Sequence, residues 1–171
     1  MHTPVSLYLK LRDLYPQSVL MESSDYHAGE NSRSFIALCP LASIAINRGT
    51  ATVTLPDGAR EEHTLPDRPE AVTDALRDFM NRFHVSGDDR RVCGLYGYTT
   101  FNAVRYFERI PVRESCEERN DAPDIYYILY RYVIVINPFR SELRLVELRA
   151  DGEASGLPAL EAAIDNRNYA T

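Results

Sequence analysis

The sequence has no long apolar run, no surplus of positive charge and few cysteines. A transmembrane helix needs about 20 consecutive apolar residues, so we expect no membrane-spanning helix, and Met1–Pro4 lacks the features of a signal peptide. The 25 acidic and 19 basic residues leave a net charge of −6, which argues against a nucleic-acid-binding protein. Cys39, Cys93 and Cys116 show neither metal-ligand nor disulfide spacing. These absences together predict a cytoplasmic protein with reduced thiols.

Catalytic motifs are also missing. The sequence contains no phosphate-binding glycine loop, no Gly-x-Ser-x-Gly elbow and no His-Glu-x-x-His pair. The acidic residues between 112 and 121 are interpreted as a solvated charge run, because nothing nearby supplies further metal ligands. The histidines are interpreted as surface residues: His2, His27, His63 and His84. We therefore predict no catalytic residue and no metal site in this chain.

Short apolar runs separated by turn signals predict an α+β fold built mainly on an antiparallel sheet. The expected strands are 19–23, 33–39, 42–47, 51–55, 60–65, 91–98, 125–136 and 142–149. The expected helices are 5–14, 69–83, 100–107 and 157–164. The first strands follow one another closely enough to form a meander, and a few helices flank the sheet.

Three features sharpen this prediction. The stretch 125–136 is almost continuously apolar and aromatic, which is typical of a central strand buried on both faces. In the helix 69–83 one apolar stripe includes Met80, which we expect in the core. Gly97 is expected to permit a close approach of two backbones.

A polar segment joins the first two expected strands. Glu22 and Ser23 end one strand, and Arg33 opens the next. A carboxylate, a hydroxyl and a guanidinium at fixed positions could bind both charged ends of a free amino acid. The alternative is a simple ion pair between Glu22 and Arg33 at the strand edge, of a kind that contributes little on surfaces.

Three separated segments resemble anthranilate synthase component I in the right order. They are Thr3–Val5 with Leu20–Ser23 and Arg33–Ile36, then Gly94–Tyr98 with Ala103–Glu108 and Pro111, and finally Ala122–Asp124 before the long strand. Met21 stands where this family usually has leucine, which conserves volume. The resemblance covers essentially the whole chain.

The resemblance implies that residues 1–171 form a single N-terminal regulatory domain. The chorismate-binding domain of the family, with the Mg²⁺ ligands and all catalytic groups, is then absent from this chain, which we expect to be inactive alone and to hold no cofactor. Family members convert chorismate to anthranilate and pyruvate, the first step of tryptophan biosynthesis. The implied partners are L-tryptophan, the chorismate-binding domain of the same parent chain and a glutamine amidotransferase subunit.

Carried over by position, the tryptophan-binding residues are Glu22, Ser23, Arg33 and Ser34. Glu22 would face the ammonium group of this feedback inhibitor, Ser23 would contact the inhibitor, and Arg33 would meet its carboxylate. Two other functions remain open at this point. One is the N-terminal domain of aminodeoxychorismate synthase component I, and the other is a freestanding amino-acid-binding module without an enzyme partner.

Overall fold

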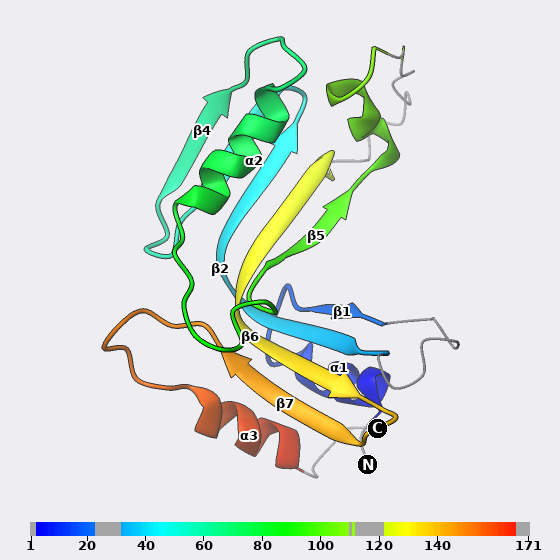
Figure 1. Cartoon of the computed structure of the whole chain (residues 1–171), viewed down its shortest axis with the longest axis vertical. Helices are drawn as coiled ribbons and strands as arrows, with labels where there is room; N and C mark the ends of the chain where they lie inside the picture. The colour runs from blue at the N-terminus through cyan, green and yellow to red at the C-terminus, as the bar shows by residue number, and fades with distance from the viewer. Residues whose placement is uncertain (1–2, 23–31, 110, 112–121, 167–171) are drawn as a thin grey trace. The chain divides into compact units, whose positions relative to one another are not determined.

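A computed structural model of the chain describes residues 3–22, 32–109, 111 and 122–166 (Figure 1). The strands are β1 (Val19–Met21), β2 (Ser34–Asn47), β3 (Thr50–Thr54), β4 (Arg60–Thr64), β5 (Leu95–Thr99), β6 (Ile125–Asn137) and β7 (Glu142–Glu147). The helices are α1 (Pro4–Leu11), α2 (Ala71–Asn81), the 3₁₀ helix η2 (Phe101–Tyr106) and α3 (Leu157–Asp165).

Antiparallel pairing dominates the sheet. Its hydrogen-bonded order is β4-β3-β2-β6-β5, with β1 paired to β2 and β7 paired to β6. The pairs β1–β2, β2–β3, β3–β4, β5–β6 and β6–β7 are all antiparallel. The predicted α+β class and the meander are therefore confirmed.

The chain forms two compact units, and β2 and β6 each contribute to both. The first comprises residues 1–40, 87–94 and 130–171, and the second comprises residues 41–86 and 95–129. In the first unit α1 and α3 pack on one face of the strands (Figure 1). The buried core residues there are Leu7, Leu11, Ile36, Leu38, Tyr132, Ile134, Ile136, Leu160 and Ile164.

Local sequence explains how the helices of the first unit begin. Thr3 caps α1, because its hydroxyl accepts a hydrogen bond from the Ser6 amide at 3.1 Å, and Pro4 occupies the first turn. A proline also lies in the first turn of α3. None of the helices in the described residues has the length and apolar character needed to span a bilayer.

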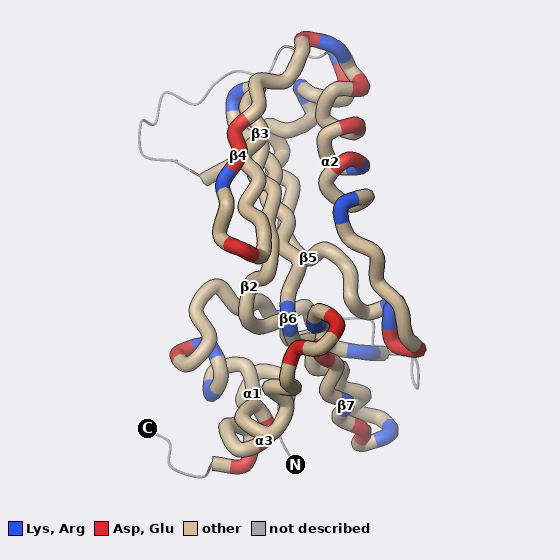
Figure 2. Tube along the Cα trace, turned by 90° about the vertical axis from the view of Figure 1, so that its left-hand side faces the viewer, with Lys and Arg blue, Asp and Glu red and all other residues tan. Residues whose placement is uncertain are grey.

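The second unit is built around the hairpin of β3 and β4, with α2 beside it. Val72 and Phe79 of α2 are buried, as are Ile44 and Val53 of the strands. Both acidic and basic residues lie along α2 (Figure 2). Met80, which was predicted in the core, is 56% exposed. That prediction is wrong because Met80 directly follows the buried Phe79, and one residue is a rotation of about 100° around the helix, which turns Met80 toward solvent.

The long strand and the close backbone approach were predicted correctly. β6 is buried along most of both faces, from Ile125 to Asn137. A Cβ atom at position 97, which Gly97 lacks, would lie only 1.9 Å from the carbonyl oxygen of Tyr126 on β6. No residue with a side chain fits there without moving β5 away from β6.

β2 is one strand where two were predicted. Pro40 lies inside it, and Cys39 has a positive φ of 63°. The strand survives because β1 pairs with Phe35–Ala37 and β3 pairs with Ser43–Asn47, so that neither ladder uses the position of Pro40. A proline without an amide hydrogen is tolerated at such a gap.

Two boundaries near residue 100 also differ from prediction. The strand predicted over 91–98 begins only at Leu95, because the amides of Val92 and Cys93 donate to turn carbonyls instead of a ladder. The predicted helix 100–107 is a 3₁₀ helix, as the i→i+3 bond from Phe107 to Val104 shows. The predicted charged loop 112–121, with Cys116, lies outside the described residues.

Candidate functional site

The end of the β1–β2 pair carries the residues that the sequence singled out. Met21 pairs with Phe35, so the register continued by one residue sets Glu22 beside Ser34. Ser34 is buried and Glu22 is exposed. Ser23 lies outside the described residues. The structure thus brings Glu22 and Ser34 to neighbouring positions on adjacent strands.

Arg33 lines a cavity of about 360 Å³ in the first unit. The other lining residues come from the end of β6 and the start of β7: Val135, Asn137, Glu142, Leu143 and Arg144. We call this space the strand-end cavity. The register sets Val135 opposite Arg144 and Asn137 opposite Glu142. Because cross-strand partners share a face, these four residues lie on the face opposite Ile134 and Ile136, which pack against the helices.

Hydrogen bonds fix the floor and one rim of the strand-end cavity. The side-chain oxygen of Asn137 accepts hydrogen bonds from the amides of Phe139 and Arg140, both at 3.1 Å. Arg144 forms an ion pair with Asp89, with 2.9 Å between Nη1 and Oδ1. The two hydrogen bonds accepted by Asn137 stabilise the turn that follows β6 and hold that side chain in place.

The two charges expected to act together do not pair. Among the described residues neither Glu22 nor Arg33 has an ion-pair or hydrogen-bond partner through its side chain, so the alternative of a simple Glu22–Arg33 ion pair is not observed. Arg33 lines the strand-end cavity and Glu22 does not. Side chains alternate between the two faces of a strand. Ser34 and Glu22 therefore lie on the face that packs against the helices, whereas Arg33 lies on the opposite face.

Sequence reasoning missed the contribution of β7 to this site. Glu142 and Arg144 lie more than a hundred positions after Arg33, and nothing local connects them. The only signal was the sequence Asn137–Arg140 between the expected strands 125–136 and 142–149, which is typical of a turn that returns one strand beside the other.

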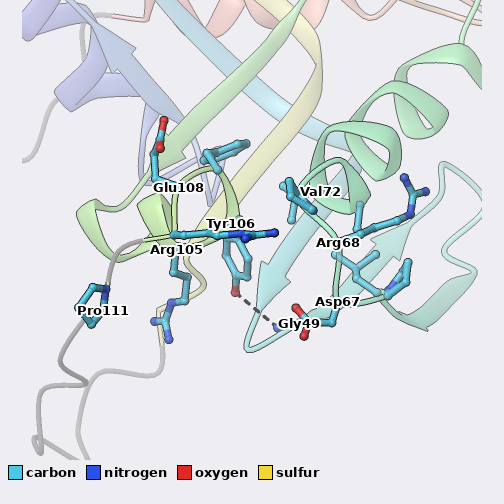
Figure 3. Close-up of a pocket in the computed structure, with 14 residues that line it drawn as sticks. Gly49, Asp67, Arg68, Val72, Arg105, Tyr106, Glu108 and Pro111 are labelled. Atoms are coloured by element: carbon cyan, nitrogen blue, oxygen red, sulfur yellow. Dashed lines mark hydrogen bonds between the residues drawn. The ribbon is translucent and has the colours of Figure 1, made fainter.

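A second and larger cavity of about 710 Å³ lies within the second unit (Figure 3). Arg105 and Glu108 lie on one wall, and Arg68 and Val72 lie on the other. Tyr106 lies between them, and its hydroxyl accepts a hydrogen bond from the Gly49 amide at 3.4 Å. This cavity combines charged and apolar groups but contains none of the predicted site residues.

A buried carboxylate supports the wall of this larger cavity. Tyr106 donates a 2.6 Å hydrogen bond to Asp124, which is only 6% exposed. Arg105 approaches the other carboxylate oxygen at 3.5 Å. Burial, and next the hydrogen bond to Asp124, raise the pKa of Tyr106. The phenol therefore stays protonated and remains a donor across the neutral pH range.

The described part of the chain contains no cluster of three or more His, Cys, Asp or Glu side chains that could hold a metal ion. The acidic run considered above lies at residues 112–121, outside that part. The cysteines Cys39 and Cys93 are free thiols in the structure.

Comparison with known proteins gives a consistent result. No family model matches the chain. Anthranilate synthase component 1 from Thermus thermophilus is 30% identical over 156 residues, which are 90% of this chain and 31% of that protein. The Pseudomonas putida protein of the same name is 29% identical over 147 residues, or 85% of this chain and 29% of that protein.

The fold agrees with these relatives. The crystal structure of anthranilate synthase component I from Streptococcus pneumoniae superposes with a TM-score of 0.51 at 20% identity, covering 96% of this chain and 33% of that one. The predicted resemblance to anthranilate synthase component I is confirmed, and it extends over most of this chain. The chain spans about a third of the length of the proteins that it matches.

Proposed function

We propose that this chain is the regulatory domain of an anthranilate synthase component I and supplies half of a tryptophan feedback-inhibition site. Glu22, Ser23, Arg33 and Ser34 are the proposed contacts. The observation that carries the proposal is Arg33, a guanidinium without an ion-pair partner among the described residues that lines a cavity of ligand size. The sequence similarity to relatives of that name supports the choice of enzyme.

The proposed domain would regulate a reaction that other parts of the enzyme catalyse. A chorismate-binding domain would supply the catalytic groups and hold Mg²⁺, and a glutamine amidotransferase subunit would supply ammonia. The role of residues 1–171 would be to bind L-tryptophan beside that domain in the cytoplasm. The relatives favour this function over the aminodeoxychorismate synthase domain, because those compared above are named for anthranilate synthase. A freestanding amino-acid sensor remains the second candidate.

Inhibition of the assembled enzyme tests the proposal. The chain would be linked to a chorismate-binding domain, and anthranilate fluorescence would be followed as L-tryptophan is added. Arg33→Ala and Ser23→Ala should each raise the half-inhibiting tryptophan concentration about ten- to a hundredfold, as expected for one lost charge-assisted contact. Each variant is normalised to its own uninhibited rate.

Arg91→Ala is the matched control, because Arg91 is exposed and lines none of the cavities described above. Its inhibition curve should equal that of the unaltered enzyme. The unlinked chain with chorismate, Mg²⁺ and ammonium should form no anthranilate. Unchanged inhibition in both site variants, or turnover by the unlinked chain, would contradict the proposal.

A further inference from the structure

Two opposite charges face the strand-end cavity without neutralising each other. Arg33 and Glu142 both line it, and both are exposed. Neither side chain has an ion-pair partner among the described residues, so they lie too far apart to form an ion pair with each other. A ligand that carries a carboxylate and an ammonium group on one carbon could neutralise both at once.

The third charged residue of the cavity behaves differently. Arg144 is already compensated by Asp89 at 2.9 Å. A compensated guanidinium attracts a further carboxylate less strongly than an uncompensated one. The charge available for a ligand carboxylate is therefore that of Arg33.

The remaining lining suits the rest of an amino acid. Val135 and Asn137 are 5% exposed and form a fixed floor on β6. Leu143 lines the cavity from its position between Glu142 and Arg144, but it pairs with Ile136, so its side chain belongs to the helix-facing side of β7. Groups held on paired strands are positioned before the ligand arrives, which lowers the entropic cost of binding.

We propose that Glu142 binds the ammonium group of a free α-amino acid in the strand-end cavity while Arg33 binds its carboxylate. This inference rests on the proposed function for the ligand and for Arg33, and it takes the partner of the ammonium group from β7. It gives Glu142 the role that the resemblance assigns to Glu22, which does not line the cavity. The chain then carries both charge partners of the ligand by itself.

Three related probes test the contributions of the two charged residues to binding one at a time. L-tryptophan has both groups, tryptamine lacks the carboxylate, and indole-3-propionate lacks the ammonium. Binding to the 171-residue chain would be measured by NMR shifts of backbone amides during titration. Glu142→Gln should weaken L-tryptophan and tryptamine about three- to tenfold and leave indole-3-propionate unchanged. Arg33→Gln should weaken L-tryptophan and indole-3-propionate and leave tryptamine unchanged.

Glu161→Gln and Glu22→Gln complete the set. Glu161 is an exposed residue of α3, a helix that packs on the other face of the strands, and its variant should bind all three probes normally. Amide spectra establish that each variant is folded. The inference is overturned if Glu22→Gln shows the ammonium-specific loss while Glu142→Gln does not, or if L-tryptophan does not bind the chain. The inhibition experiment above then still decides the proposed function separately.

Discussion

Replacing Gly97 by alanine tests the closest backbone contact in the second unit. The new methyl carbon would lie 1.9 Å from the Tyr126 carbonyl oxygen and 2.9 Å from the Tyr127 Cα. A carbon and an oxygen normally approach no closer than about 3.3 Å. Both neighbours are backbone atoms, so no side-chain rotation relieves the clash. β5 must move away from β6, which strains the ladder that pairs Gly97 with Tyr127.

We expect Gly97→Ala to lower the free energy of unfolding by about 2–4 kcal/mol, which combines overpacking with a weakened ladder hydrogen bond. Urea unfolding followed by circular dichroism measures this as a lower midpoint at unchanged slope. Gly94→Ala is the control, because a methyl group there meets no atom within 4 Å. Its effect should stay within about 0.5 kcal/mol. Equal midpoints for the two variants would refute the reasoning.

Two further predictions concern buried carboxylates. Burial disfavours the charged form of Glu147, but hydrogen bonds from Ser155, Gly156 and Arg131 outweigh it and lower its pKa. Glu147 therefore stabilises the fold above its ordinary pKa of about 4.3, and this contribution is lost as the pH falls through the lowered value. Glu147→Gln should cost about 1–3 kcal/mol at pH 7 and less at pH 3 in urea unfolding, and an equal loss at both would contradict the assignment. Tyr106→Phe should lower the free energy of unfolding by about 1–3 kcal/mol, because it removes a hydrogen-bond donor from buried Asp124. The control Tyr98→Phe, at a residue that is 40% exposed, should change it by no more than about 0.5 kcal/mol. Thermal unfolding compares the two variants, and equal melting temperatures would exclude the proposed support by Tyr106.

Local sequence was sufficient where one short stretch carries the whole signal. The apolar run 125–136 predicted a strand buried on both faces, because its odd and its even positions are both mostly apolar. β6 is buried on both faces along most of its length. Pro4 and the pair Tyr15–Pro16 further on predicted the opening helix, which is present as α1. Met80 and Pro40 show the limit of such patterns. Whether a border residue is covered, or a proline interrupts a ladder, depends on the neighbouring element and not on the residues beside it.

The sequence by itself determined the family resemblance, the α+β class and the candidate residues around Glu22 and Arg33. Only the tertiary structure decided which charges share a cavity. Arg33 lines the same cavity as Glu142 and Arg144 because β2 and β7 both pair with β6, a long-range arrangement that no local pattern encodes. Alternation along the strands then separates Arg33 from Glu22, although the two residues are close in sequence. Strand pairing and the alternation of side chains between the two faces therefore determine which residues line the strand-end cavity, and both depend on the register of the folded sheet.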